Sequence, residues 1–181
     1  MSNLENVVER VLISEEEIKA CIKRLAAEID KDYEGKNPLM VSVLSGSFIF
    51  VADLMRAINV PTEISFIFAS SYASGTVSSG KVEISAGKGF DPAGRDIIIV
   101  EDIIDSGRTL SNLKQYLADS GATSVEICTF LDKPSRRLVD VEVKYTGFEI
   151  PDEFVIGYGL DYDYKYRQFP YVGVLKRECY E

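Results

Sequence analysis

One stretch of sequence decides the fold of this chain: Val100-Glu101-Asp102-Ile103-Ile104-Asp105-Ser106-Gly107-Arg108-Thr109-Leu110. Before it, residues 96–100 are apolar and β-branched, which is typical of a buried strand. After it, Leu110, Leu113 and Leu117 recur at helical spacing, and Gly121 stands where a helix ends. The stretch is therefore predicted to be the turn from a central strand into a helix. In an open parallel sheet, such turns bind the ligand.

The two halves of this stretch suit different parts of a ligand. Gly107 lets the backbone turn successive N–H groups toward one point, and a helix N-terminus favours an anion, so this half suits a phosphate. Ser106 and Thr109 add hydroxyl donors. Glu101 and Asp102 would repel a phosphate and suit sugar hydroxyls or a divalent cation. A sugar phosphate that carries a second, metal-bound phosphate group satisfies both halves.

An alternative is that the acids are solvated loop residues and that Ser106 only caps a helix. Three acids within positions 101–105 directly follow a run of buried aliphatic residues. Such acids are expected at the bottom of a cleft and not on a free surface, which favours the ligand site.

Composition sets limits on the kind of protein. The chain has 181 residues, of which 46% are hydrophobic and 27% charged, as expected of one soluble globular domain. Its 20 basic and 29 acidic residues give a net charge of −9, which argues against nucleic-acid or membrane partners. We expect no membrane span and no signal peptide. Cys21, Cys128 and Cys179 are predicted to be reduced thiols of a cytoplasmic protein.

The chain contains no histidine. This excludes zinc sites of the usual kind and nucleophiles activated by an imidazole base. Any proton transfer must therefore use a carboxylate, a lysine or a tyrosine.

A second strand–loop–helix unit is predicted in the first third of the chain. A capping box at residues 14–17 begins a helix with an apolar stripe. Residues 39–44 then read as a buried strand, Ser45-Gly46-Ser47 as a small loop, and residues 48 to about 58 as an apolar helix. From local sequence alone, this loop could also be a plain tight turn.

The serine- and glycine-rich segment 70–80 separates two predicted strands, residues 62–69 and 81–85. A segment that cannot pack a core is either a linker or a functional lid. Because a strand resumes after it, we interpret it as a lid formed by a long hairpin. Residues 89–94 do not form a P-loop, since they lack Lys-Ser/Thr and precede a strand.

The remaining strands are predicted at residues 124–131, 141–148, 154–157 and 171–175. Lys133 follows the first of these, so it lies at the same rim of the sheet as Glu101 and Asp102, although a lone lysine there is usually solvated. The four tyrosines of residues 158–167 could form the aromatic edge of a core.

Alternating strands and helices predict an α/β fold with a central, mostly parallel sheet flanked by helices. The N-terminal segment and the residues beyond 148 do not fit this alternation, so they are expected to form a small hood over the carboxyl ends of the strands. We therefore expect a single domain, residues 1–181, with a core of about residues 35–147 and a hood of about residues 1–15 and 148–181.

The opening stretch resembles the phosphoribosyl-diphosphate signature of the type I phosphoribosyltransferases. Further segments match the hypoxanthine-guanine phosphoribosyltransferases of the bacterial type in order and spacing: residues 44–47, 71–72, 131–134 and 151–162. The similarity runs from about Val11 to Lys176. It implies a type I phosphoribosyltransferase fold and an enzyme of purine salvage. Such an enzyme moves the 5-phosphoribosyl group of phosphoribosyl diphosphate to hypoxanthine or guanine, giving IMP or GMP and pyrophosphate.

The resemblance also implies roles for single residues. Asp105 is expected to be the acid/base group beside the purine five-membered ring, and Lys133 to donate to the 6-oxo group. Phe154 is expected to stack on the base, and the Val155 backbone to read its Watson–Crick edge. The other implied substrate contacts are Glu101 and Asp102 for the ribose hydroxyls; Ser106, Gly107, Arg108, Thr109 and Leu110, with the adjoining Ile104, for the 5-phosphate; Leu44, Ser45, Gly46, Ser47 and Arg167 for pyrophosphate; and Ser71 and Tyr72 for the lid.

The cofactor implied by the resemblance is Mg²⁺, with Glu101, Asp102 and Asp161 as ligands. The implied partners are phosphoribosyl diphosphate, a purine base and further copies of the chain in a homodimer or homotetramer. The apolar helix 48–58 could supply the contact between copies.

Two positions depart from the pattern. Many relatives carry a basic residue at the position of Ser45, and glycine commonly stands at that of Ala73. The first departure puts in doubt the charge of the pyrophosphate loop, and the second the freedom of the lid. The sequence leaves open the preference among hypoxanthine, guanine and xanthine.

Two rival functions are weaker. A regulator that only binds phosphoribosyl diphosphate should lack the base-recognition residues, or carry a basic surface for nucleic acid. This chain has Lys133, Phe154 and Asp161 and is acidic. A nicotinamide-dependent dehydrogenase needs Gly-x-Gly-x-x-Gly in its first βα turn, which the sequence lacks.

Overall fold

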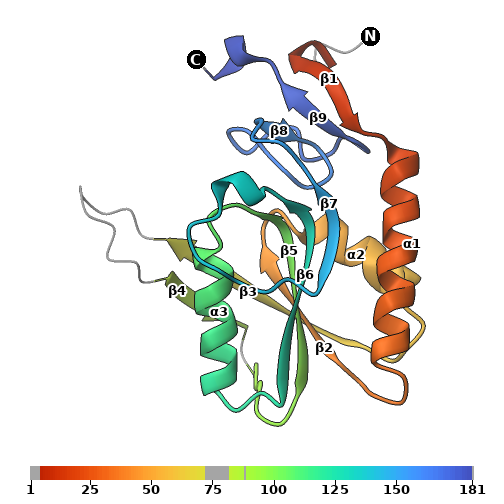
Figure 1. Cartoon of the computed structure of the whole chain (residues 1–181), viewed down its shortest axis with the longest axis vertical. Helices are drawn as coiled ribbons and strands as arrows, with labels where there is room; N and C mark the ends of the chain where they lie inside the picture. Colours follow the sequence, from red (N-terminus) through yellow and green to blue (C-terminus); the bar gives the residue numbers. More distant parts are fainter. Residues whose placement is uncertain (1–4, 72–81, 88, 181) are drawn as a thin grey trace.

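The structure is a computed structural model that describes residues 5–71, 82–87 and 89–180 (Figure 1). Its helices and strands alternate through the middle of the chain. In chain order they are η1 (Glu5–Val7), β1 (Val8–Ile13), α1 (Glu15–Asp32), β2 (Leu39–Leu44), α2 (Phe48–Ala57), β3 (Glu63–Ser71), β4 (Val82–Ala86), β5 (Asp96–Ile104), α3 (Arg108–Asp119), β6 (Ser124–Asp132), η2 (Pro134–Arg136), β7 (Tyr145–Glu149), β8 (Val155–Ile156), β9 (Val172–Leu175) and η3 (Arg177–Cys179).

The central sheet has the strand order β4-β3-β2-β5-β6-β7. Its pairs are parallel from β3 to β7, and only β4 is antiparallel to its neighbour. Strand β5 lies in the middle, in register with β6 from Asp96 opposite Ser124 to Ile104 opposite Asp132. The predicted α/β fold with a mostly parallel sheet is therefore confirmed. The carboxyl ends of β2, β5 and β6 meet at one rim.

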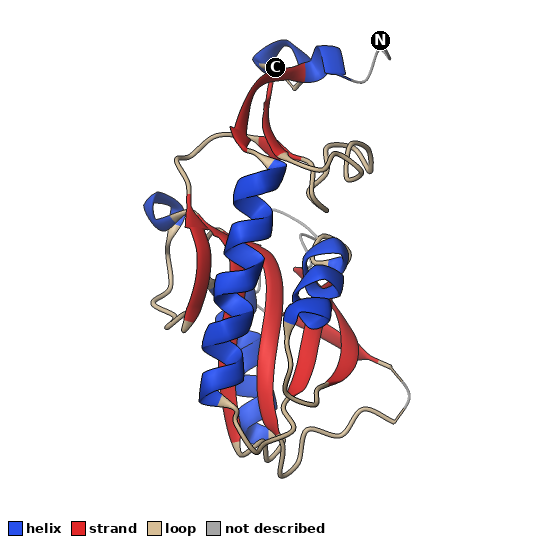
Figure 2. Cartoon of the chain, turned by 90° about the vertical axis from the view of Figure 1, so that its right-hand side faces the viewer, coloured by secondary structure: helices blue, strands red, loops and turns tan. Residues whose placement is uncertain are grey.

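Helices cover both faces of this sheet. Helices α1 and α2 pack on one face, against side chains such as Ile98 and Val100 of β5, and α3 packs on the other, against Ile97 and Ile99 (Figure 2). Because strand side chains alternate between faces, a continuous apolar run is what a strand buried on both sides requires. The hydrophobic core thus includes α1. This helix falls almost wholly between the predicted hood, which ends at about residue 15, and the predicted core, which begins at about residue 35.

The predicted helix ends are confirmed. The Ser14 hydroxyl accepts from the Glu17 amide at 3.3 Å, and the Glu17 carboxylate accepts from the Ser14 amide at 2.8 Å, so the capping box begins α1. Gly107, with φ of 80°, precedes α3. Gly121, with φ of 88°, follows it after the last turn, a conformation that glycine adopts at low cost.

A second sheet, with the order β1-β9-β8, is antiparallel and stands above the rim (Figure 1). Strand β1 was not predicted, because its side chains are mostly exposed and its pattern is weak. The predicted strand 141–148 is wrong in its first half, since β7 begins only at Tyr145. The chain before β7 instead lies against the turn after β5, where the Leu138 and Val139 amides both donate to the Ser106 carbonyl, at 3.0 and 3.1 Å.

Strands β3 and β4 form the expected antiparallel hairpin, with Ser71 opposite Val82. The proposed lid between them, with Tyr72 and Ala73, lies outside the described residues, and so does the side chain of Ser71. None of the helices in the described part of the chain has the length and hydropathy that crossing a membrane requires.

Candidate active site

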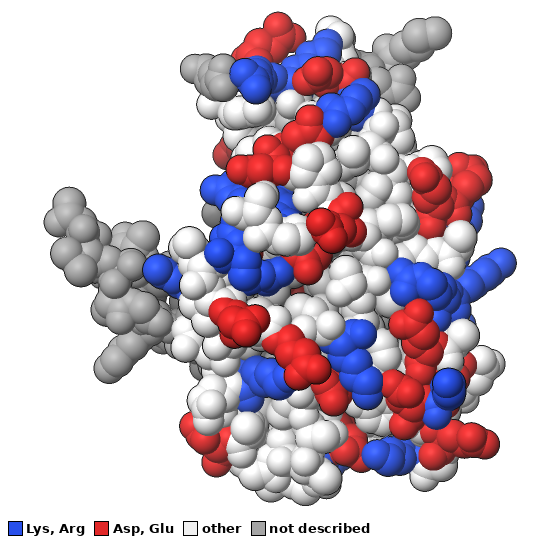
Figure 3. Space-filling model, in the orientation of Figure 1, with Lys and Arg blue, Asp and Glu red and all other residues white. Residues whose placement is uncertain are grey.

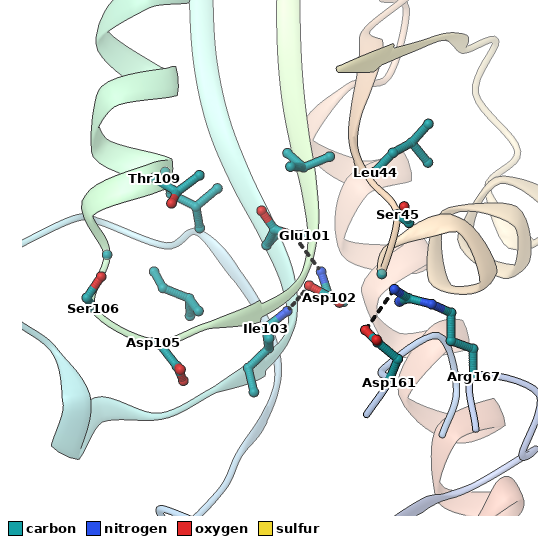
Figure 4. A pocket seen from close by; sticks show the side chains of 15 residues that line it. Leu44, Ser45, Glu101, Asp102, Ile103, Asp105, Ser106, Thr109, Asp161 and Arg167 are labelled. Atoms are coloured by element: carbon teal, nitrogen blue, oxygen red, sulfur yellow. Dashed lines mark hydrogen bonds and ion pairs between the residues drawn. The ribbon is translucent and has the colours of Figure 1, made fainter. Parts of the chain in front are cut away.

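A cavity of about 360 Å³ opens at the rim of the central sheet, below the hood. The ends of β2 and β5, the start of α3 and the hood loop 157–167 contribute to it (Figure 4). Most of the predicted site residues line this cavity: Leu44, Ser45, Gly46, Glu101, Asp102, Ile104, Asp105, Ser106, Gly107, Thr109, Leu110, Asp161 and Arg167.

The acidic pair at the end of β5 is shielded from water, since Glu101 is buried and Asp102 is half-buried. Each carboxylate accepts a hydrogen bond from the next amide: Glu101 from the Asp102 N–H at 3.3 Å, and Asp102 from the Ile103 N–H at 2.8 Å. Burial raises the pKa of Glu101 well above its usual value, and the neighbouring Asp102 charge adds to this. Burial also raises the pKa of Asp102. Two such carboxyls favour a ligand that brings hydroxyl donors or a cation.

The turn from β5 into α3 has the form of an anion site. A Cβ at Gly107 would lie 2.7 Å from the Val139 carbonyl oxygen, so the segment after η2 closes against the turn and only glycine fits. The twelve-residue helix α3 begins there, and the first amides of a helix have no partner within the helix, which favours a phosphate. Ser106 and Thr109 line the same side of the cavity (Figure 4).

Lys133 and Asp105 face each other across a gap. The Lys133 side chain is almost fully buried at the end of β6, and its Nζ lies 4.0 Å from Asp105 Oδ1 and 4.0 Å from Asp152 Oδ1. Asp105 Oδ1 is itself buried and has no hydrogen-bond partner among the described residues. A buried lone acceptor beside a buried ammonium, both too far apart to bond, suits a ligand that bonds to each of them.

The loop after β2 presents backbone to the cavity. The Leu44–Ser45 peptide bond is cis. The Ser42 and Ser47 hydroxyls are buried and bond to each other at 2.7 Å, which ties the two ends of the loop. A Cβ at Gly46 would lie 1.5 Å from Asp102 Oδ2, so the loop lies directly against the acidic pair.

The hood contributes one charged pair. Arg167 Nη2 donates to Asp161 Oδ1 at 2.7 Å, and Arg167 Nη1 donates to the Gly159 carbonyl (Figure 4). The Tyr164 amide donates to the other Asp161 oxygen at 2.9 Å. The tyrosine-rich segment is thus a loop that brings a cation and an anion to the cavity wall, while Tyr158 packs into the core and Tyr162 and Tyr166 pack against the small apolar cluster of the hood.

Some predicted residues lie outside the cavity wall. Arg108 is exposed, and Val155 is buried in the hood sheet. Phe154 is stacked against Tyr180 at a centroid distance of 5.2 Å. Conversely, Val43 and Ile103 line the cavity and were not predicted. Only their positions at the ends of β2 and β5 could have indicated this.

The residues fit a magnesium ion that arrives with a phosphorylated substrate. Among the described residues, no three Asp, Glu, Cys or His side chains form a group that could hold a metal by themselves. Asp161, the third predicted ligand, is paired with Arg167, and the set of Glu101, Asp102 and Asp161 stays a prediction. Mg²⁺ at phosphate sites is commonly held by one or two carboxylates together with phosphate oxygens. The buried acidic pair supplies that set.

Charge on the surface is distributed in a way that suits an anionic substrate. On the face in Figure 3, acidic and basic side chains mix over most of the surface. Basic side chains gather near η2 and the start of α3, where Arg108 and Arg136 are exposed. This cluster lies beside the turn from β5 into α3, and basic side chains there favour the approach of an anion.

Known proteins resemble this chain in sequence and in structure. The phosphoribosyl transferase domain family matches residues 12–163. The chain belongs to the phosphoribosyltransferase family. The resemblance inferred from the sequence is thus confirmed.

Two curated relatives cover nearly the whole chain. The hypoxanthine-guanine phosphoribosyltransferase of Streptococcus pneumoniae is 49% identical over 98% of both chains. That of Lactococcus lactis is 51% identical over 98% of this chain and 97% of its own. Among solved structures, a hypoxanthine phosphoribosyltransferase from Staphylococcus aureus superposes with a TM-score of 0.94 at 44% identity, and covers 99% of this chain and 98% of its own.

Proposed function

We propose that this phosphoribosyltransferase transfers the 5-phosphoribosyl group of phosphoribosyl diphosphate to hypoxanthine or guanine, with release of pyrophosphate. The observation that carries the proposal is a cavity that joins an acidic pair, a phosphate-type turn and Asp105, whose Oδ1 lies 4.0 Å from the buried Lys133 ammonium. The relatives that are 49% and 51% identical over 98% of this chain are named hypoxanthine-guanine phosphoribosyltransferases, which supports the same reaction.

The phosphate and the ribose occupy the β5–α3 side of the cavity in this proposal. The turn at Ser106 to Leu110 binds the 5-phosphate through its amides and hydroxyls, while Glu101 and Asp102 accept from the ribose hydroxyls. Bound hydroxyl donors offset the cost of ionising the two buried carboxyls. The ribose C1 then faces the gap between Asp105 and the loop after β2.

Charge develops on both sides of the broken bond. Cleavage at the ribose C1 leaves positive charge on the sugar ring and negative charge on pyrophosphate. The Ser45–Ser47 amides and Arg167 stabilise the second, and preorganised donors of this kind act without reorganisation during the reaction. Mg²⁺, held by the acidic pair, would neutralise phosphate charge when bound. The lid after β3 would exclude water.

The base lies at the Lys133 side in this proposal. The Lys133 ammonium donates to the 6-oxo oxygen, and the free Asp105 Oδ1 takes the proton of the attacking ring nitrogen. Phe154 stacks on the base, and the Val155 backbone reads its Watson–Crick edge. The whole chain acts as one domain, with the hood carrying Phe154, Asp161 and Arg167.

One assay tests the proposal: release of pyrophosphate from phosphoribosyl diphosphate with hypoxanthine, guanine, xanthine or adenine, each with Mg²⁺ or with excess chelator. Release with the oxo-purines that stops in chelator is expected. No release with any base would refute the activity. Full release in chelator would refute only the role of the metal.

We further propose that the protein works in the cytoplasm as a homo-oligomer. All three cysteines are unpaired thiols, which suits a reducing compartment. On the α2 side of the sheet, no described helix covers β3, and its Ile64, Phe66 and Phe68 are 38–57% exposed. Phe48 of α2 is also 44% exposed, and a second copy would bury these apolar side chains. A monomer in sedimentation experiments would refute this assembly.

A further inference from the structure

Tyr158 holds an unusual place at the entrance of the hood loop. Its φ is 49°, a left-handed conformation that is costly for a residue with a side chain, and its neighbours Gly157 and Gly159 also have positive φ. The side chain is nonetheless buried. A strained backbone persists only where the surroundings hold it, so the contacts of Tyr158 indicate what it is for.

The side chain of Tyr158 bonds the hood to the core. Its hydroxyl donates to Asp53 Oδ2 of α2 at 2.7 Å, and its ring packs against Phe130 of β6 at a centroid distance of 4.8 Å. Asp53 also pairs with Arg56 on the surface of α2. A hydrogen bond from a buried hydroxyl to a carboxylate is among the stronger kinds in proteins.

The backbone of the same residue and its neighbour holds the charged pair of the hood. The Tyr158 amide donates to the Phe169 carbonyl at 2.9 Å, and the Gly159 amide donates to the Arg167 carbonyl at 3.0 Å. The Arg167 guanidinium donates back to the Gly159 carbonyl. Any shift of Tyr158 therefore moves Arg167 and, through it, Asp161.

The loop also touches the opposite wall of the cavity. A Cβ at Gly159 would lie 2.1 Å from the Gly46 carbonyl oxygen, and Gly46 in turn lies against Asp102. Helix α2 begins directly after the Ser45–Ser47 loop, so Asp53 and Gly46 belong to one unit. The bond between Tyr158 and Asp53 thus spans the two walls between which pyrophosphate is proposed to leave.

We propose that Tyr158 and Asp53 are positioning residues that set the separation between the Ser45–Ser47 loop and the Asp161–Arg167 pair. Neither touches the reacting atoms. The inference rests on the proposed function, since it assigns these two walls to the diphosphate. Tyr158 and Asp53 thus act on the diphosphate end of the site. The base end is separate, because Asp105 follows β5 and Lys133 follows β6.

Tyr158→Phe tests the pair, because it removes the hydroxyl and keeps the ring. Tyr145→Phe is a matched control: that hydroxyl is also bonded to an acid, Asp32 Oδ2, at 2.8 Å, but at the end of α1 far from the hood. Misplacement of a positioning group can cost up to about 10²-fold, and we expect kcat/KM for phosphoribosyl diphosphate to fall about 10-fold in Tyr158→Phe. The KM for hypoxanthine should stay within about twofold in both variants.

The carboxylate is tested from the other side. Asp53→Asn should reproduce the same split, and Arg56→Ala, which removes only the surface partner of Asp53, should not. Asp53→Asn added to Tyr158→Phe should cost little more than either change alone, because both remove one interaction. Asp53→Asn also serves if Tyr158→Phe does not fold.

Wild-type kinetics in Tyr158→Phe, equal effects in Tyr158→Phe and Tyr145→Phe, or a rise in the KM of both substrates would overturn the inference. Those results leave the proposed function intact, since wild-type pyrophosphate release is measured in the same assay. A wild-type protein without pyrophosphate release would overturn both.

Discussion

Two turns at the same rim of the sheet differ in what they offer a ligand. The turn after β5 presents side chains: carboxylates from Glu101, Asp102 and Asp105, and hydroxyls from the start of α3. The turn after β2, on the neighbouring strand, presents backbone, with its serines bonded to each other or solvated and Gly46 pressed against Asp102.

The two kinds of turn suit different tasks in one site. Side chains can discriminate and move protons, because their chemistry differs from residue to residue. Backbone amides stabilise charge without discriminating, and their position depends on close approach and not on residue type. In this chain the β5–β6 side should therefore control which base reacts and how, while the β2 side should control only how well the diphosphate is held.

The largest effect that would sharpen this comparison concerns base choice. An ammonium has hydrogen-bond donors and no acceptor. Lys133 should therefore donate to the oxygen of a 6-oxo purine, and it cannot bond to the 6-amino group of adenine. A site that depends on a specific hydrogen bond rejects the wrong partner by about 10⁴–10⁵, and we expect that ratio of kcat/KM for hypoxanthine over adenine.

Lys133→Met should narrow this ratio, while Arg136→Met, a change in the exposed neighbour that pairs with Asp152, should leave it unchanged. Competition assays with both bases measure it. Adenine used within about tenfold of hypoxanthine would show that Lys133 does not select the base.

The next effect concerns the proton. Asp105→Asn keeps the size of the side chain and removes the carboxylate that could take up a proton. In the wild type, its Oδ1 has no partner among the described residues. General acid–base catalysis is worth about 10²–10⁴, and we expect kcat to fall by that factor while phosphoribosyl diphosphate still binds. Single-turnover rates measure the change.

Asp152→Asn is the matched control, since Asp152 Oδ1 lies at the same 4.0 Å from Lys133 Nζ. It should change kcat by less than about threefold, well below the range for a general base. Equal losses in both variants would mean that the charge around Lys133 matters and not proton transfer.

A smaller effect tests the backbone turn. In Gly46→Ala, the new Cβ would meet the Asp102 carboxylate, the end of a movable side chain, so the protein should fold while the acidic pair shifts. A displacement of about 1 Å at a substrate contact costs about 10² in rate, and we expect such a loss in kcat/KM for phosphoribosyl diphosphate.

Selectivity between hypoxanthine and adenine should not change in Gly46→Ala. Gly87→Ala, at a glycine with open space around it, should behave as wild type. A changed base preference in Gly46→Ala would break the division between the two turns.

The smallest effect concerns stability. Burial raises the pKa of Glu101, so the folded protein binds this proton more tightly than the unfolded chain, and ionisation costs stability as pH rises above the ordinary carboxyl range. Glu101→Gln removes that cost. A buried polar group without adequate partners costs about 1–3 kcal/mol, and ~1 kcal/mol raises Tm by about 2–4 °C in a domain of this size.

The gain should be present at neutral pH and vanish below pH ~4, where Glu101 becomes protonated in the unfolded chain as well as in the folded one. Thermal melts of the ligand-free protein across pH measure it. Glu149→Gln, at an exposed carboxylate of β7, should show no such gain. A loss of Tm in Glu101→Gln at neutral pH would contradict the burial cost.

Features that depend on the pattern of nearby side chains could be predicted from the sequence, whereas close backbone contacts could not. The capping box of α1, the apolar run of β5 and the position of Lys133 at the rim depend on local pattern and on the rule that parallel strands end together. The contact of Gly46 with Asp102 and the left-handed Tyr158 depend on approaches between distant segments. No local pattern encodes these.

The same limit explains the errors. Residues 141–144 have the alternation of a strand, but the chain just before them is bonded to Ser106 through the Leu138 and Val139 amides, so it reaches β6 only at Lys144, whose amide donates to the Ile127 carbonyl at 3.2 Å. Ile64, Phe66 and Phe68 alternate along β3 and so share one face, yet that face is exposed, since periodicity reports which residues share a side and not what covers it.

Among the described residues, Asp105 Oδ1 is a buried acceptor without a partner at the cavity, and this has a consequence outside the reaction. A ligand that gives such groups their partners binds the folded chain and not the unfolded one, and it stabilises the fold by about 2.7 kcal/mol at a hundred times its Kd. Where proteases remove unfolded chains, the lifetime of this protein then rises with the supply of its substrates. Scarcity of those substrates would lower both its rate and its amount.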